Sequence, residues 1–384
     1  MPPHAHTITR RAILARTALA AATLPVASMA TSCAVPTAKS TQSANQLTIG
    51  YVPIACATPL ILAHANNLFE QRGLTVKLKK FAGWADLWSA YSTGELDVAH
   101  MLSPMPIAMN AGATNGQRPT EIAFTQNTNG QAITLASKYV DKVSDAADFR
   151  GKVIGIPFEF SVHALLFRDY LTAGGVDPVA DLELRLLRPS DMIAQLQVGG
   201  IDGFVGPEPF NQRAIASGAG RIFKLTKELW PGHPCCSVAM SKDWRSTHST
   251  QAELITEALA EASKIANDPA KQHEVAKTLG REEYLNQPAK LFLPTFSGEY
   301  ENWHGQAVVD HGRMSFGDAT DPAAITWMAT QIARWKLGGD ALIMDDPTLI
   351  KFADSVLPAD IGHGSESITV NGREFNPNIP TIGY

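Results

Sequence analysis

The sequence has few cysteines and no surplus of positive charge. Its 384 residues include four cysteines, 32 lysines and arginines, and 37 aspartates and glutamates, for a formal net charge of −5. It contains no run of basic residues interleaved with aromatics, so it carries no general attraction for nucleic acid or anionic lipid. Any selectivity for an anion must therefore come from a local site.

The sequence also lacks the common catalytic motifs. It has no Gly-rich phosphate loop, no HExxH motif and no recognisable Ser/His/Asp set. No second cysteine pair stands at zinc-binding spacing. We therefore predict a protein that is not an enzyme and has no cofactor and no metal site.

The N-terminus indicates export. Paired arginines, Arg10 and Arg11, precede a mild apolar run from Ala18 to Ala30, which resembles a twin-arginine signal and is too short to span a membrane. Small residues then lead to Cys33, a pattern typical of a lipid-modified cysteine. We predict that residues 1–33 are the export signal of a lipoprotein anchored at the periplasmic face of the cytoplasmic membrane. The alternative is cleavage after Ala30 with a free thiol.

Residues 34–45 are small and polar and predict a flexible tether. If Cys33 is acylated, Cys56, Cys235 and Cys236 remain, an odd number for an exported chain. Adjacent cysteines rarely bridge each other because the ring is strained. A link from Cys56 to one of the other two therefore stays open.

Hydrophobic periodicity alternates between strand and helix along most of the chain. Strand patterns at 47–53 and 75–81 flank a helical pattern at 58–70, and the same alternation restarts after a polar break at 127–131. Such alternation predicts an α/β fold built on mostly parallel sheets covered by helices. The tail from 362 to 384 is expected to be an extended surface strap.

The stretch from 151 to 171 has the clearest local signals. Residues 152–156 read as a buried strand that Pro157 ends, and Ser161 can cap a helix beginning just after it. His163 then falls in the first turn of that helix, where free N–H groups and the helix dipole favour an anion. Two interpretations stay open, an anion ligand or a histidine that only packs.

Six motifs, read in chain order, resemble one known family, the nitrate- and bicarbonate-binding proteins of ATP-driven importers. They lie at His100–Pro106, Gly130–Leu135, Arg150–His163, Asp202–Asn211, Glu228–Pro234 and Ile325–Trp335. The resemblance covers roughly residues 46–355. It implies the type II periplasmic-binding-protein fold, with two α/β lobes that close on a ligand by a hinge and hold it in an inter-lobe cleft. One lobe would hold residues 46–128 plus 241–384, and the other residues 129–240.

The resemblance also implies the binding residues. In nitrate-binding relatives a tryptophan, a glutamine, a histidine, a glycine N–H and a lysine hold the anion. The first four match Trp84, Gln131, His163 and Gly206, the glycine to within a position. Where the relatives have lysine, this chain has a cysteine pair, and we place Cys236 at the site. A buried anion without a cationic partner is costly by several kcal/mol.

The resemblance implies a solute-binding protein, acting as a monomer, that captures nitrate, nitrite or bicarbonate and delivers it to the permease of an ABC importer. The missing lysine leaves open an organic solute instead, such as a sulfonate or a heterocyclic thiamine precursor. A third reading is an enzyme similar to pyrimidine-precursor synthases of this fold, which the export signal argues against.

Overall fold

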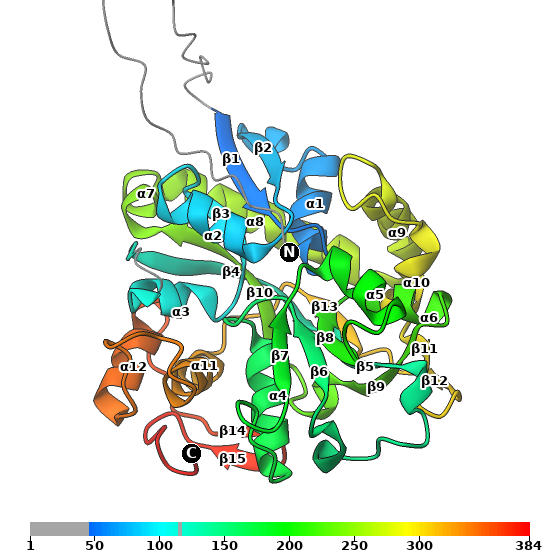
Figure 1. Cartoon of the computed structure of the whole chain (residues 1–384). Helices are drawn as coiled ribbons and strands as arrows, with labels where there is room; N and C mark the ends of the chain where they lie inside the picture. Colours follow the sequence, from blue (N-terminus) through cyan, green and yellow to red (C-terminus); the bar gives the residue numbers. More distant parts are fainter. Residues whose placement is uncertain (1–45, 114–116) are drawn as a thin grey trace, which may run out of the picture. The chain divides into compact units, whose positions relative to one another are not determined.

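Two mixed β-sheets form the centre of the fold (Figure 1). The structure is a computed structural model that describes residues 46–113 and 117–384. The predicted export signal at 1–33, its Cys33 and the tether at 34–45 lie outside the described residues. Among the described residues, no helix combines the length and apolar character needed to cross a membrane.

The first sheet has six strands and combines the start of the chain with later segments. β1 pairs in parallel with β2 and β3, whereas β10 runs antiparallel to both β3 and β4. The strands, in spatial order, are β13 (Met314–Phe316), β4 (Thr120–Asn129), β10 (Pro234–Ser241), β3 (Val98–Leu102), β1 (Gln46–Tyr51) and β2 (Thr75–Lys80).

The second sheet has five strands from the middle of the chain. β6 pairs in parallel with β7 and β8, and β5 is antiparallel to β8 and β9. The strands, in spatial order, are β7 (Glu183–Leu186), β6 (Val153–Ile156), β8 (Gly203–Pro207), β5 (Gln131–Ala136) and β9 (Gly220–Leu225).

The expectation of mostly parallel sheets is wrong for the strands near the two crossings between sheets. The pairing rule behind that expectation applies where a helix returns the chain to its own sheet. β5 enters the second sheet directly after β4 of the first, and β10 enters the first sheet through the loop that follows β9 of the second. Both strands therefore run antiparallel to their neighbours.

β10 also bears on the expected lobe boundary at residue 240. All of Pro234–Ser241 pairs within the first sheet, with β3 on one side and β4 on the other. The second crossing therefore precedes Pro234. The first crossing is a tight turn, in which Asn129 and Gly130 have φ of 58° and 90°. A side chain at Gly130 would also meet Met314 at 2.9 Å, so glycine is required there.

Helices cover the sheets and supply much of the buried apolar surface. α8 packs on α1, and α11 packs on α12, α4 and α3. The helices are α1 (Thr58–Ala65), α2 (Trp84–Ser92), α3 (Met105–Asn110), α4 (Val162–Ala173), α5 (Pro189–Gln197), α6 (Phe210–Ala216), α7 (Lys242–Thr247), α8 (Ser249–Asn267), α9 (Gln272–Gly280), α10 (Leu293–Ser297), α11 (Pro322–Arg334) and α12 (Asp346–Asp354).

The C-terminal tail is more structured than the extended strap that its composition predicted. It contains the hairpin of β14 (Ile368–Val370) and β15 (Arg373–Phe375). Outside the tail, another short hairpin pairs β11 (Glu299–Glu301) with β12 (Ala307–Val309). Asp169 of α4 is fully buried and contacts Arg373 and Arg334. This carboxylate ties the tail to α4 and α11.

Candidate functional site

His163 lies where the strand–turn–helix pattern predicted. β6 ends at Ile156, Ser161 is the N-cap of α4, and its Oγ accepts a hydrogen bond from the Ala164 N–H at 3.2 Å. The imidazole of His163 is fully buried, and neither ring nitrogen has a hydrogen-bond partner among the described residues. Burial, assisted by the nearby His233, lowers the pKa of His163 to about 3. The ring is therefore neutral at physiological pH and can donate one N–H.

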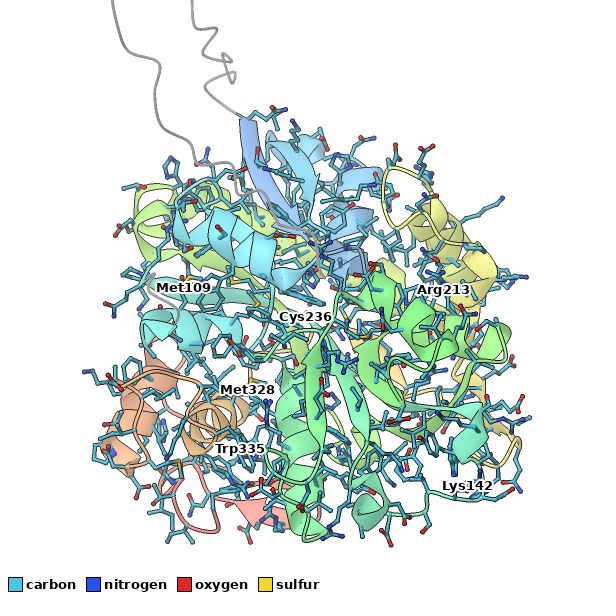
Figure 2. The ribbon with its side chains drawn as sticks, in the orientation of Figure 1. Met109, Lys142, Arg213, Cys236, Met328 and Trp335 are labelled. Atoms are coloured by element: carbon cyan, nitrogen blue, oxygen red, sulfur yellow. The ribbon has the colours of Figure 1, made fainter. Side chains whose placement is uncertain are left out.

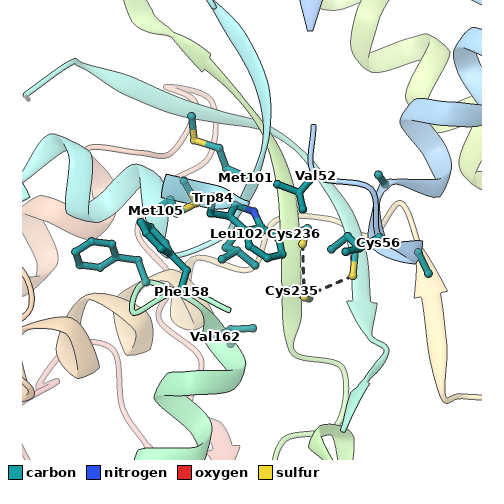
Figure 3. Close-up of a cluster of buried hydrophobic side chains, with 14 of the residues drawn as sticks. Val52, Cys56, Trp84, Met101, Leu102, Met105, Phe158, Val162, Cys235 and Cys236 are labelled. Carbon is teal, nitrogen blue, oxygen red and sulfur yellow. Dashed lines mark hydrogen bonds between the residues drawn. The ribbon is translucent and has the colours of Figure 1, made fainter. Parts of the chain in front are cut away.

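Trp84 begins α2, immediately after the loop that follows β2. Its side chain is fully buried, and in the described part of the chain its indole Nε1 has no acceptor. Buried polar groups are nearly always hydrogen-bonded, because an unpaired one costs about 1–3 kcal/mol. Figure 3 shows Trp84 in the same cluster of buried side chains as Cys56, Cys235 and Cys236.

Gln131 is the first residue of β5, directly after the tight crossing from the first sheet. Its side chain is 1% exposed. Its Oε1 lies 2.9 Å from Nε2 of His233, and its Nε2 lies 3.7 Å from the Cys56 sulfur. The crossing thus places Gln131 beside residues from both sheets.

Gly206 lies on β8, next to β5. The register sets Gly206 opposite Ala132 and Pro207 opposite Gln131. A Cβ at Gly206 would meet the Phe204 ring at 3.0 Å and the Met192 sulfur at 3.3 Å, so the backbone here is closely packed. Gly206 is therefore adjacent in sequence to Pro207, the residue that pairs with Gln131.

Cys236 lies on β10, opposite Leu102 of β3. Cys236 is fully buried, and Figure 2 labels it near the middle of the view, whereas the exposed Lys142 is near the edge. Its sulfur is 3.6 Å from that of Cys235, which in turn is 3.9 Å from that of Cys56. All three cysteines are fully buried free thiols. Burial raises the pKa of Cys235 and Cys236 well above the ordinary thiol value.

His233 belongs to this group, and the predicted site did not include it. It is fully buried, and its Nδ1 lies 2.7 Å from the Trp230 carbonyl oxygen and its Nε2 2.9 Å from Oε1 of Gln131; a neutral ring donates to only one of these two oxygens. Burial lowers its pKa to about 4, so it is neutral at physiological pH. The signal in the sequence was its position two residues before the cysteine pair, but only the fold brings it to Gln131.

The arrangement can donate hydrogen bonds but supplies little positive charge. The groups around Gln131 and the three thiols are amides, the Thr226 hydroxyl and a neutral histidine. The buried Arg313 is paired with Glu208, which absorbs its charge. A polar solute bound here would be held by neutral hydrogen-bond donors in a site that is buried away from solvent.

Comparison with known proteins identifies the family. A model of the NMT1-like family matches residues 11–280, more than half of the chain. The chain belongs to the NMT1-like family.

Relatives of known name agree with this assignment. The bicarbonate transport ATP-binding protein CmpC of Synechocystis is 32% identical over 305 residues, which cover 75% of this chain and 46% of that protein. This NMT1-like chain thus spans about half the length of that relative. The nitrate/nitrite binding protein NrtA of Nostoc is 29% identical over 369 residues, covering 86% of this chain and 83% of that protein.

A solved structure confirms the fold. The periplasmic nitrate-binding protein NrtA from Synechocystis superposes with a TM-score of 0.80 at 22% identity, covering 88% of this chain and 96% of the other. The NMT1-like chain therefore has the α/β, type II periplasmic-binding-protein fold, as the resemblance implied. The relatives named above are binding and transport proteins, which agrees with the expectation that this chain is not an enzyme.

Proposed function

We propose that this protein is the extracytoplasmic solute-binding component of an ABC importer and that it captures a small oxyanion, namely nitrate, nitrite or bicarbonate. Trp84, Gln131 and His163 would hold the anion, and Gly206 and Cys236 would lie next to it in the binding site. The names of the relatives, which refer to nitrate, nitrite and bicarbonate, support this ligand class.

One observation carries the proposal. Two side chains that the sequence singled out, Trp84 and His163, are fully buried donors without partners in the described part of the chain. Leaving both unsatisfied would cost about 1–3 kcal/mol each. A small planar oxyanion offers several acceptor oxygens to such donors, and binding it would turn these costs into favourable contacts.

Neutral donors can hold a single negative charge, though less tightly than a site with lysine. A hydrogen bond to a charged group contributes about 1.5–3 kcal/mol, so two or three such bonds can offset part of the desolvation of a monovalent anion. We therefore expect weaker binding than in a site that includes a cation. Bicarbonate could in addition donate its hydroxyl proton to the Gln131 carbonyl oxygen.

The burial of these residues implies that binding involves opening. Trp84, Gln131 and His163 are at most 1% exposed, so a ligand can reach them only if the surrounding parts separate. We propose that the two sheets mark two lobes, with residues 46–128 and those from Pro234 onward in one and 129–233 in the other. Closure of the lobes would let the permease distinguish loaded from empty protein. A lipid anchor at Cys33 and a monomeric state remain parts of this proposal.

Calorimetric titration of the reduced full-length chain with nitrate, nitrite and bicarbonate tests the function. We expect saturable heat with at least one anion. His163→Ala should reduce that affinity at least tenfold because it removes one of the two unpartnered donors. His248→Ala is the matched control, because His248 is an exposed histidine on another element.

Two outcomes would contradict the oxyanion assignment. The first is unchanged affinity in a folded His163→Ala protein, and the second is no heat with any of the three anions. In the second case the cysteine pair in place of the lysine favours an organic solute, and titration with an alkanesulfonate and a heterocyclic thiamine precursor would follow.

A further inference from the structure

Three cysteines that lie far apart in the sequence meet in the interior. Cys56, Cys235 and Cys236 are fully buried, and their sulfur atoms all lie within 4.8 Å of one another. Figure 3 shows Cys235 between the other two, with dashed contacts of 3.9 Å to Cys56 and 3.6 Å to Cys236. We propose that these three sulfurs form a binding site for one thiophilic metal ion of the Zn²⁺ or Cu⁺ class.

The spacing of the sulfurs matches such an ion. Three thiolates at about 2.3 Å from a metal, arranged at tetrahedral angles, have sulfurs about 3.8 Å apart. Two of the three separations, 3.6 and 3.9 Å, lie on either side of that value, and the third is within 4.8 Å. Soft thiolate ligands select Zn²⁺ and Cu⁺ over hard cations such as Mg²⁺ or Ca²⁺.

The backbone of β10 explains how two adjacent cysteines can serve one site. Neighbouring residues on a regular strand point to opposite faces of the sheet. The pairing of β10 with β4 is irregular here, with register shifts between Pro234 and Cys236 and between Cys236 and Ser237. This irregularity lets both sulfurs approach Cys56, which lies in the short 3₁₀ turn Ala55–Ala57 after β1.

Side-chain amides surround the sulfurs in the way that amides support metal ligands. Nε2 of Gln131 lies 3.7 Å from the Cys56 sulfur. Oδ1 of Asn127 accepts from the Cys236 backbone N–H at 3.3 Å and so holds that part of β10. Contacts of this kind orient thiolates and moderate their charge. The site therefore has ligands, spacing and supporting groups from three segments of the chain.

The net charge of the metal–thiolate complex makes this metal site independent of the proposed oxyanion binding. Binding of Zn²⁺ would release three thiol protons, and the ion with three thiolates carries a net charge of −1; the Cu⁺ complex would carry −2. A metal here therefore does not replace the lysine of the relatives. It would instead weaken an anion held close by, so the metal site neither requires oxyanion binding nor follows from it.

The test uses the reduced, oxygen-free, full-length protein and Co²⁺ as a spectroscopic substitute for Zn²⁺. We expect thiolate-to-cobalt charge-transfer absorption that saturates at one equivalent and disappears when one equivalent of Zn²⁺ is added. Cys56→Ser and Cys235→Ser should each weaken Co²⁺ binding at least tenfold. Cys33→Ser, which changes the remaining cysteine of the sequence, should leave the spectrum unchanged.

A second measurement needs no variant. Under conditions in which the metal-free protein is alkylated at Cys56, Cys235 and Cys236, one equivalent of Zn²⁺ should protect these three thiols, as identified by mass spectrometry. The proposal is overturned if the reduced protein shows no charge-transfer band, or if the band survives in a folded Cys56→Ser protein. It is equally overturned if Zn²⁺ leaves alkylation unchanged and the only chemistry found is a Cys56–Cys235 disulfide formed by an added oxidant.

Discussion

Three buried histidines lie in very different surroundings. His233 has partners on both ring nitrogens, namely the Trp230 carbonyl and the Gln131 side chain. His163 and His100 have none within the described residues. His163 stands at a helix start beside His233, whereas His100 is in the middle of β3, opposite Val238 of β10. The residue type alone does not separate a ligand-binding histidine from one buried in a sheet.

His100 should make the stability of the protein depend on pH. Burial lowers its pKa from 6.5 to about 3, so between these values the unfolded chain binds a proton that the folded chain does not. Stability therefore falls as the pH drops below 6.5. This single group should account for a loss of about 2 kcal/mol between pH 7 and pH 5.

Urea unfolding at the two pH values checks this prediction. His100→Leu keeps the buried volume similar and removes the titrating group, so the variant should lose about 2 kcal/mol less than the parent on acidification. His163 and His233 are present in both proteins, and their contributions cancel. Equal losses in the two proteins would show that His100 is accessible to protons in the folded state.

At the scale of elements, β6 and α4 form the unit that positions His163. Local signals predicted the strand, its end at Pro157 and the cap at Ser161, and the structure confirms all three. The hydroxyl of Ser161 also donates to the Phe158 carbonyl at 2.8 Å, which shapes the turn before the helix. The cap therefore determines where the first turn begins and where the imidazole lies.

Replacing the cap should lower stability by a modest and predictable amount. We expect Ser161→Ala to reduce the free energy of unfolding by about 1 kcal/mol, because the Ala164 N–H loses its acceptor. Ser161→Gly is the matched control and should cost only a few tenths of a kcal/mol. Chemical denaturation measures both; a Ser161→Ala protein as stable as the parent would mean that the cap bond contributes nothing.

At the scale of the whole described fold, one buried ion pair joins the two sheets. Glu208 follows β8 of the second sheet, and Arg313 precedes β13 of the first. Both side chains are 1% exposed, and the Glu208 carbonyl also accepts from the Ala55 N–H at 2.9 Å. Burial raises the pKa of Glu208, and the Arg313 charge opposes that rise. The pair connects the parts that we propose to open and close.

Breaking this pair on one side should be far worse than removing both charges. Arg313→Met leaves the Glu208 carboxylate buried without its cation and should cost about 3–5 kcal/mol in urea unfolding. The double variant Glu208→Gln with Arg313→Met should recover most of that loss, because no unpaired charge remains. A double variant as unstable as the sum of the two single changes would show that the two side chains do not interact and would contradict this prediction.

Local signals in the sequence determined several features of this fold. Alternating strands and helices, the cap at Ser161 and the place of His163 follow from the sequence because periodicity, proline and capping act over a few residues. The crossing at Gly130 also follows from the sequence, because the polar residues 127–131 interrupt the alternating strand and helix pattern there.

Tertiary structure alone decided which distant residues meet. Cys56 and Cys235 are 179 positions apart, and nothing in their local sequence shows that β10 enters the first sheet between β3 and β4. The sequence offered no second pair of cysteines at zinc-binding spacing, so it predicted no metal site. The contact of His233 with Gln131 and the pairing of Glu208 with Arg313 arise in the same way. Such contacts depend on which strands pair and in which direction, and that is settled by burial and hydrogen bonding of the whole chain.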